Sequence, residues 1–435
     1  MSHPQRTMYT RREFLGQGLG AVALASAGDS FSRALQTHAA FANRRVVGVV
    51  RSRPAPNDRV QAACIGLGHR GRQHLVGLEA VPGAAVVALC DVDQETLGRR
   101  ADELQQWTGR NVRCSVDYRR LLEDRRIDAV SIATCNHTHA LIALAALEAG
   151  KDVYIEKPCS HNLFEGRQLV RAAQQYGRIC FHGVQSRTSP AVQEAVRHLQ
   201  EGVIGRVGLA RVRCSVGGLP PAATPNEPTP ATVAYDLWLG PAPMRPFNRS
   251  RFHGCWRWWW EYGNGPLGNQ GLHLVDLARW GLGVGWPRQV RPLRNASASD
   301  APLLTPAFPW AMGGQAWVFE FPGDKTLVLE LWPNEKSEGW SGRRQPTPEM
   351  VAFYGSEGMM EVDYLGYRTF LGRRRQPGPY GQAASQEFEQ FVLAVRTRRI
   401  ERGSPSIDEG HLSSGLVHLA NIAGRLNRPL RFDPA

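Results

Sequence analysis

One short glycine-rich loop constrains the fold of this chain more than any other sequence feature. Residues 60–65 form an apolar, strand-like run, Gly66-Leu67-Gly68-His69-Arg70-Gly71 follows, and a helical pattern continues through Leu75 and Leu78. Glycines at this spacing allow a tight turn, a close approach of backbone N–H groups to a diphosphate, and close helix–strand packing. The N-terminus of the following helix favours negative charge. The loop therefore predicts a dinucleotide-binding Rossmann unit.

A carboxylate stands where such a unit contacts a ribose. The next strand-like run, residues 85–89, leads into Cys90 and Asp91, and Asp91 lies twenty residues after Gly71. A carboxylate here accepts hydrogen bonds from ribose hydroxyls and repels a 2′-phosphate. The expected cofactor is NAD, and NADP is less favoured.

Strand-like and helix-like segments continue to alternate beyond this point. The expected helices are 94–107, 137–149 and 163–176, and the expected strands are 129–133 and 152–155. Such alternation is typical of a parallel sheet covered by helices on both faces. Ligands bind at the carboxyl ends of the strands of such a sheet. Residues 134–139 and Glu156-Lys157-Pro158 are therefore expected beside the nicotinamide.

Cysteine and histidine spacing gives two further expectations. Cys135-x-His137-x-His139 places its possible ligands on one tight turn without a second pair, so no metal site is expected. Cys64, Cys90 and Cys135 fall inside or at the ends of apolar runs, where free cysteine behaves as a small buried hydrophobic residue. Few or no disulfides are expected among the eight cysteines.

The net charge of +13 raises the question of a nucleic-acid partner. The excess is carried almost entirely by arginine, and the arginine clusters are short and lack the context of a recognition helix. A genome that favours arginine codons gives the same excess without any partner. No nucleic-acid partner is expected.

The N-terminal segment predicts an export signal. Thr10-Arg11-Arg12-Glu13-Phe14-Leu15 has the twin-arginine pattern, with a chance arginine pair as the alternative, and a mildly apolar stretch follows at 16–28. That stretch is shorter than the ~20 helical residues that span a bilayer. We expect a twin-arginine signal peptide at 1–40 and a linker at 41–58. These features predict a soluble protein carried by the twin-arginine translocase, already folded, to the periplasm or otherwise exported.

The chain is long enough for two domains, since it has 435 residues and one domain usually takes about 100–200. We expect an NAD(P)-binding Rossmann domain at 59–180. The remaining residues, 181–435, are expected to form a second domain. Alternating apolar residues at 315–321 and 326–331 predict two strands joined as a hairpin at Gly323-Asp324.

Taken together, the motifs resemble the glucose–fructose oxidoreductase, inositol dehydrogenase and rhizopine-catabolism family (Gfo/Idh/MocA). The resemblance rests on the glycine loop, Cys90-Asp91-Val92-Asp93, Asn136-His137-Thr138-His139, Glu156-Lys157-Pro158, Gly183-Val184-Gln185, Gly205-Arg206-Val207, Tyr235-Asp236-Leu237-Trp238-Leu239-Gly240-Pro241, Gly268-Asn269-Gln270-Gly271-Leu272-His273, Glu409-Gly410-His411 and residues 418–423. It implies an α/β fold, with an N-terminal Rossmann domain and a C-terminal α/β domain for substrate binding and oligomerisation, built on a large open, mostly antiparallel sheet. The closing helix of that second domain is expected near 408–427. One face of that sheet would make a homodimer or homotetramer.

The resemblance also implies roles for residues of the site. Lys157 would bind the reacting hydroxyl, and His273 would be the general base that takes its proton. The family usually places an Asp four residues before this His, whereas this chain has Asn269, which cannot stabilise imidazolium by charge. Asp276 is either a substitute for that charge or a salt-bridge partner. Without the resemblance, His273 reads as a buried core histidine.

The remaining expected contacts fall into two sets. The cofactor-binding set is Gly66, Leu67, Gly68, His69, Arg70, Gly71, Asp91, Thr134, Asn136, His139, Glu156, Lys157 and Gln185. The substrate-binding set is Lys157, Arg187, Trp258, Asn269 and His273. Trp258 belongs to an aromatic run, residues 255–262, that fits either a glycan subsite or a subunit interface.

Two enzymatic activities and one non-enzymatic function remain open. The first is an NAD(P)-dependent oxidoreductase acting on a hydroxyl carbon of a small carbohydrate-like substrate, a sugar, polyol or glycoside, with a tightly held cofactor. The alternative is an NAD-dependent glycoside hydrolase that works by transient oxidation, elimination and re-reduction. An exported enzyme has no nicotinamide pool, which favours a cycle that returns the cofactor unchanged. A binding protein that retains the fold is the third possibility.

Overall fold

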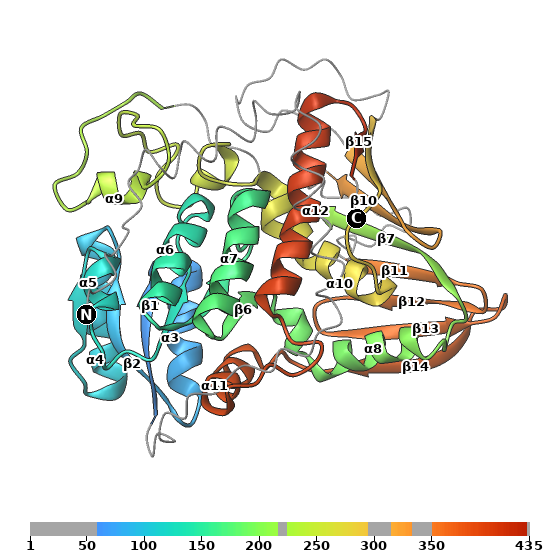
Figure 1. Ribbon diagram of the computed structural model, residues 1–435, viewed down its shortest axis with the longest axis horizontal. Helices are drawn as coiled ribbons and strands as arrows, with labels where there is room; N and C mark the ends of the chain where they lie inside the picture. Colours follow the sequence, from blue (N-terminus) through green and yellow to red (C-terminus); the bar gives the residue numbers. More distant parts are fainter. Residues whose placement is uncertain (1–58, 216–223, 295–314, 333–349, 433–435) are drawn as a thin grey trace, which may run out of the picture.

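The computed structural model describes residues 59–215, 224–294, 315–332 and 350–432. The expected signal peptide and linker lie outside these residues. The described chain forms two α/β parts, each built around its own sheet (Figure 1).

The first sheet has six parallel strands in the order β3-β2-β1-β4-β5-β6. Its strands are β1 (Val60–Ile65), β2 (Ala84–Cys90), β3 (Arg113–Ser115), β4 (Ala129–Ile132), β5 (Asp152–Glu156) and β6 (Cys180–Gly183). Its helices are α3 (His69–Ala80), α4 (Gln94–Thr108), α5 (Tyr118–Leu122), α6 (Asn136–Glu148) and α7 (Leu163–Tyr176). The strand order reverses between β1 and β4, which is where such sheets bind dinucleotides.

Local sequence explains where several of these helices begin and end. The Asp93 side chain caps α4 by accepting a hydrogen bond from the Glu95 N–H, and Asn162 caps α7 in the same way from the Glu165 N–H. Gly109 and Gly177 end these helices in the left-handed conformation that glycine adopts readily. The strands and helices expected between residues 60 and 176 are confirmed, and their ends differ by at most one residue.

The second sheet has nine strands in the order β14-β13-β12-β11-β7-β10-β9-β8-β15. They are β7 (Val207–Ser215), β8 (Gln289–Arg294), β9 (Gln315–Phe321), β10 (Lys325–Trp332), β11 (Met350–Gly355), β12 (Gly358–Val362), β13 (Gly366–Leu371), β14 (Gln376–Gln382) and β15 (Leu430–Arg431). Among the described strands of this sheet only β10 and β7 pair in parallel, so the expected mostly antiparallel sheet is confirmed. The predicted β9–β10 hairpin is also present.

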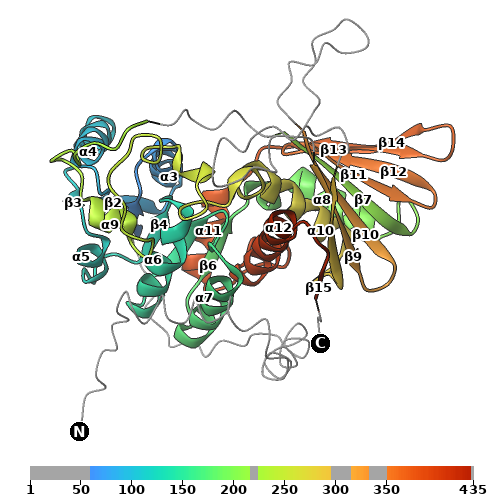
Figure 2. The same cartoon turned by 90° about the horizontal axis from the view of Figure 1, so that it is seen from above.

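Helices cover one face of the second sheet. These are α8 (Pro190–Gln200), α10 (Leu272–Leu282) and α12 (Ile407–Leu426), which lie between the two sheets in Figure 2. Alternate residues of β10, Leu327, Leu329 and Leu331, are buried against them. Alternation of this kind buries one face of a strand and leaves the other polar.

Two segments connect the second part to the first. The helix α11 (Glu387–Thr397) returns to the Rossmann sheet, where Phe388 and Phe391 share a core with β1 and α3. Residues 224–265, here named the cover segment, include the short helices α9 (Tyr235–Leu239) and η2 (Trp256–Trp258). The cover segment lies over the Rossmann part and pairs with it through a bridge between Asp93 and Val233.

Candidate active site

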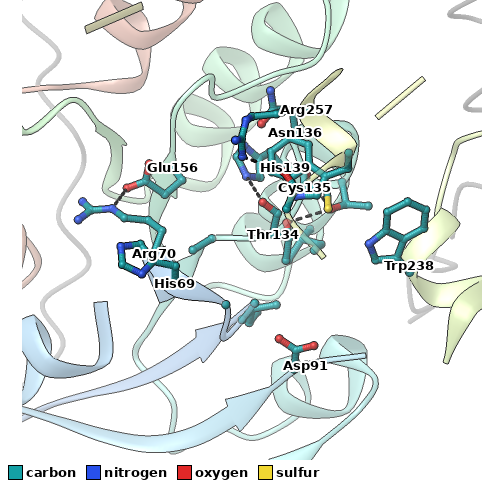
Figure 3. Close-up of a pocket in the computed structure, with 18 of the residues that line it drawn as sticks. His69, Arg70, Asp91, Thr134, Cys135, Asn136, His139, Glu156, Trp238 and Arg257 are labelled. Carbon is teal, nitrogen blue, oxygen red and sulfur yellow. Dashed lines mark hydrogen bonds and ion pairs between the residues drawn. The ribbon is translucent and has the colours of Figure 1, made fainter. Parts of the chain in front are cut away.

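A single cavity of about 630 Å³ lies at the carboxyl ends of the Rossmann strands. Its walls come from the glycine loop, the ends of β2, β4 and β5, the cover segment and the start of α10. Figure 3 shows this cavity, with Asp91 toward one end and Glu156, His139 and Arg257 away from it. One space therefore collects residues from both parts of the chain.

The three glycines of the loop have different physical roles. A Cβ atom at Gly71 would lie 1.8 Å from the Gly66 carbonyl oxygen, and one at Gly66 would lie 2.7 Å from the Ala133 backbone. These two glycines are therefore required for packing. A Cβ atom at Gly68 would meet nothing within 4 Å. The open space at Gly68, beside the first turn of α3, fits a diphosphate.

Asp91 is held at the cavity wall by two backbone donors. Its carboxylate accepts hydrogen bonds from the Leu67 N–H at 2.7 Å and from the Asp93 N–H at 3.0 Å. Burial raises the pKa of Asp91, and these two N–H groups oppose that effect. The fixed carboxylate at the cavity wall fits a ribose diol, so the residues present suit NAD.

Two members of the expected cofactor set do not line the cavity. Leu67 is fully buried and its N–H is already bound to Asp91, and Gly71 packs against Gly66. All the other members of the set lie on the cavity wall: Gly66, Gly68, His69, Arg70, Asp91, Thr134, Asn136, His139, Glu156, Lys157 and Gln185.

The cysteine–histidine turn at the end of β4 is a packing feature. His139 contacts the carbonyl oxygens of Pro158 at 2.8 Å and Thr134 at 3.1 Å. His137 contacts the carbonyl oxygens of Trp238 at 2.9 Å and Tyr262 at 3.2 Å, which ties the cover segment to α6. Within the described ranges, no group of three or more His, Cys, Asp or Glu side chains could hold a metal ion.

Glu156 lies in a buried charge network behind the cavity. Its Oε1 accepts from Arg70 Nε at 2.7 Å and contacts His74 Nε2 at 3.0 Å. Burial disfavours the charged carboxylate, but Arg70 and His74 outweigh it and hold the pKa of Glu156 well below its usual range. Arg70 also binds Glu387 of α11 at 2.8 Å. Sequence reasoning missed Glu387, because no local motif links it to a residue more than 300 positions earlier.

Lys157, Asn269 and His273 meet at one end of the cavity. Lys157 Nζ donates to the backbone carbonyl oxygen of Asn269 and, at 3.1 Å, to its side-chain Oδ1. Burial lowers the pKa of Lys157 to about 8, an effect that Glu156 opposes and that the positive charges of Arg70 and Arg257 reinforce. Among the described residues, no carboxylate forms an ion pair with Lys157.

Asn269 and His273 reach this end through an irregular helix. Asn269 lies in the π-helical turn η3 (Leu267–Gly271), which continues directly into α10. His273 is buried, and its Nδ1 has no hydrogen-bond partner in the described part of the chain. Burial, followed by the nearby positive charge of Lys157, lowers the pKa of His273 to about 3.

The structure does not bring Arg187 to the cavity. Its side chain is 1% exposed, and its Nε and NH2 atoms lie 2.7 and 3.0 Å from the carboxylate of Asp276. Arg187 also binds Glu409 at 2.8 Å. Asp276 is therefore a salt-bridge partner and does not replace the missing charge beside His273.

Trp258 also lies away from the cavity. It is 5% exposed and belongs to the core that covers the second sheet, whereas Trp256 and Arg257 line the cavity. The aromatic run is thus divided between core packing and the cavity wall. Sequence reasoning placed the run near the site but could not determine which side chain faces the cavity, because the short helix η2 has no simple periodicity.

These features define a two-domain α/β protein with a dinucleotide site that opens onto a lysine–asparagine–histidine cluster. The chain matches the description "Oxidoreductase family, NAD-binding Rossmann fold" over residues 60–184 and "Oxidoreductase family, C-terminal alpha/beta domain" over residues 220–291. Residues 60–184 are thus similar to the NAD-binding domain of the Gfo/Idh/MocA oxidoreductase family, and residues 220–291 to part of its C-terminal domain.

Several known proteins are similar to parts of this chain in sequence or in fold. It is 34% identical to scyllo-inositol 2-dehydrogenase (NAD(+)) of Bacillus subtilis over 38% of this chain and 47% of that protein. It is 29% identical to levoglucosan dehydrogenase of Pseudarthrobacter phenanthrenivorans over 52% of each. The chain thus spans about half the length of these curated relatives. The crystal structure of the aldose–aldose oxidoreductase from Caulobacter crescentus has the same fold, with a TM-score of 0.63 at 19% identity over 86% of this chain and 100% of that one.

Proposed function

We propose that this chain is an NAD-dependent oxidoreductase that moves hydride between a sugar or polyol hydroxyl carbon and a tightly held nicotinamide cofactor. The main support is that one cavity contains both the dinucleotide cradle and the cluster of Lys157, Asn269 and His273. The names of the relatives, which are dehydrogenases of inositol and of an anhydrosugar, support a substrate of this class.

Several residues of this chain would hold the cofactor. The backbone at Gly68 would face the diphosphate, Asp91 would accept from the ribose hydroxyls, and Thr134 and Asn136 would lie nearer the nicotinamide. When bound, the cofactor supplies the hydride acceptor for alcohol oxidation. The cover segment supports tight retention, because it contributes His253 and Trp256 to the cavity wall and is tied to the Rossmann part by the Gln94 N–H, which donates to the Thr232 carbonyl oxygen at 2.9 Å.

The proton of the reacting hydroxyl would pass to Lys157. A neutral amine at Lys157 can take the proton as the carbon loses hydride, and its pKa of about 8 suits that exchange. His273 would accept a hydrogen bond and orient the hydroxyl, because a pKa of about 3 makes its imidazole a weak base. This assignment exchanges the roles that the family resemblance implied for the two side chains.

A pH profile with two variants tests this proposal. With NAD and a panel of inositols and sugars, kcat/KM for oxidation is expected to rise with pH through about 8 as Lys157 loses its proton. Lys157→Met should lose about 10²–10⁴-fold in rate, the usual size of proton-transfer catalysis. His273→Asn should be slower but should keep the rise. A profile that loses the rise in His273→Asn would instead make His273 the base.

The glycoside hydrolase alternative has less support, because the two dehydrogenases match over 165 and 231 residues, whereas a glycosyl hydrolase family 109 protein matches over 127. Incubation of the purified protein with p-nitrophenyl glycosides, without an added acceptor, separates the two activities. Nitrophenol release without net NADH would favour hydrolysis. Identification of the nucleotide released on denaturation tests both tight retention and the preference for NAD over NADP.

We further propose export through the twin-arginine route and assembly as a homodimer or homotetramer, with domains at 59–180 and 181–435. The signal motif at Arg11-Arg12 supports export. In the described ranges, no helix has both the length and the apolar character needed to cross a bilayer.

Strand β6 joins the first sheet as far as Gly183, so the first domain is best drawn a few residues longer. Cell fractionation and light scattering test export and assembly.

A further inference from the structure

The reacting end of the cavity has an unbalanced charge. The cavity wall contains two carboxylates, Asp91 and Glu156. Asp91 lies toward the other end (Figure 3), and Glu156 is already bound by Arg70 and His74. At Asn269, the chain has a neutral amide beside Lys157. No free negative charge therefore faces Lys157 from the described cavity wall.

A second cation, Arg257, lies on the same wall. It is one of the residues that line the cavity (Figure 3). Arg257 is half-buried, and its NH1 donates to the Gly254 carbonyl oxygen at 2.7 Å. It forms no ion pair with a carboxylate of the described residues. Its charge lowers the pKa of Lys157, so the two cations act on the same space.

The backbone fixes the position of Arg257. A Cβ atom at Gly263 would lie 2.5 Å from the Arg257 Cα, so the two backbone segments pass in direct contact. The next residue, Trp258, anchors η2 in the core of the second part. Arg257 is therefore held at the wall by its chain neighbours, although its guanidinium still has N–H donors to offer.

As water is displaced, a neutral ligand would leave Arg257 without a paired carboxylate and Lys157 with only the attraction of Glu156, which forms no ion pair with it. Buried or partly buried charge is costly unless it is paired. A carboxylate would supply the missing charge, and the planar guanidinium matches its two oxygens.

We propose that Arg257 is a specificity-determining residue that selects a sugar carrying a carboxylate, such as a uronic or aldonic acid. This inference rests on the proposed function, because it names the substrate class of the same site. The carboxylate binds Arg257, while a hydroxyl of the same molecule binds Lys157. The reaction itself is unchanged.

Binding to the NADH-loaded full-length protein tests the inference without turnover, because the reduced cofactor cannot accept hydride from a hydroxyl substrate. Isothermal titration would compare each acid with a neutral counterpart: D-glucuronate with D-glucuronamide, D-galacturonate with D-galactose, and D-gluconate with D-glucitol. At least one acid is expected to bind roughly tenfold or more tightly than its counterpart, the size of one charge-assisted pair. Added salt should reduce that preference. If no acid exceeds its counterpart, the inference is overturned.

Variants assign the preference to one side chain. Arg257→Met should remove the preference for the acid, and Arg257→Lys should retain part of it. Arg374→Met, on the exposed β13–β14 turn, should leave it unchanged. If Arg257→Met releases NAD but leaves the acid preference intact, Arg257 serves the cofactor and the inference fails.

The two proposals fail in different ways. If acids and neutral sugars are oxidised equally well, the oxidoreductase stands and the selection by Arg257 is wrong. If acids bind through Arg257 but no substrate in the panel reduces bound NAD, the binding inference stands and the proposed activity is wrong.

Discussion

Asn269 determines the charge around the reacting group. Its Oδ1 accepts from Lys157 without adding negative charge, and His273 lies four residues further along the chain. Burial lowers the pKa of both Lys157 and His273. Asp276 of α10 does not oppose this effect, because it is paired with Arg187. A single amide thus allows both cavity bases to be neutral at mildly alkaline pH.

Asn269→Asp is expected to move the pH–rate profile to higher pH. The new carboxylate would stabilise ammonium at Lys157, which raises its pKa, and nearby opposite charges do so by about 1–3 units. Activity at neutral pH should fall, while activity at high pH should recover. Asn269→Ala, which removes the contact without adding charge, should not shift the profile upward. An unmoved profile in Asn269→Asp would show that another group controls the rate.

Because the surroundings of Gly71 and Gly68 differ, substitution of these two loop glycines is expected to affect different properties, stability and NAD affinity. Gly71→Ala forces a Cβ against the Gly66 carbonyl oxygen and should cost about 1–3 kcal/mol or more of stability, as overpacking does. Gly68→Ala has free space and should change stability by about 0.5 kcal/mol or less. NAD affinity of Gly68→Ala should nevertheless fall about tenfold or more, because the methyl group occupies the diphosphate space. Urea unfolding and NAD titration separate the two effects, and equal behaviour of the variants would contradict these roles.

At the scale of elements, the cover segment was the part that sequence could not predict. The glycine loop, Asp91 and Lys157 follow regular strands, so strand and helix periodicity predicted their positions at the strand ends. Arg187 and Trp258 lie in short 3₁₀ helices, where periodicity does not indicate which side chain faces a cavity. Trp256 and Arg257 lie in the same short helix as Trp258, and His253 lies in the turn before it, so periodicity did not single out these three side chains.

His253 is expected to slow the release of nucleotide. Its Nε2 contacts Asp93 Oδ2 at 2.8 Å and holds the cover segment against the start of α4. His253→Ala should speed NADH release roughly two- to fivefold, since an exposed ion pair contributes about 0.2–1 kcal/mol. Arg249→Ala is the matched control, because Arg249 pairs with Glu227 inside the same segment. Stopped-flow fluorescence of bound NADH measures the release rates. Equal acceleration by both variants would contradict a specific role of the His253–Asp93 contact.

At the scale of the whole molecule, buried neutral histidines connect the two parts. His137 contacts the cover segment, His418 of α12 contacts Ser160 at 3.3 Å, and His182 lies in β6 under α12. Burial lowers the pKa of His137 and His418 to about 3 and that of His182 to about 4. These side chains therefore remain neutral in the folded chain and take protons when it unfolds.

Stability is expected to fall as the pH drops below about 6.5, the usual pKa of histidine in an unfolded chain. Above that value the histidines are neutral in both states, and below it only the unfolded state gains protons. Each one then costs up to about 1.4 kcal/mol per pH unit. Urea unfolding between pH 7.5 and 5 tests this loss, and His418→Gln should give a shallower slope than the parent chain. A flat stability curve over that range would contradict the prediction.

The return of α11 to the Rossmann part has a consequence for synthesis. Glu387 binds Arg70 and Tyr154, and Phe388 packs against Gly77 of α3. The core of the Rossmann part is therefore completed only after α11 has been synthesised, roughly two hundred residues after the last Rossmann strand, β6. Until then the side of α3 that packs against Phe388 is expected to remain accessible to water and to chaperones. A stable nucleotide complex is thus expected only when translation is nearly finished, which sets cofactor loading late in the life of the nascent protein.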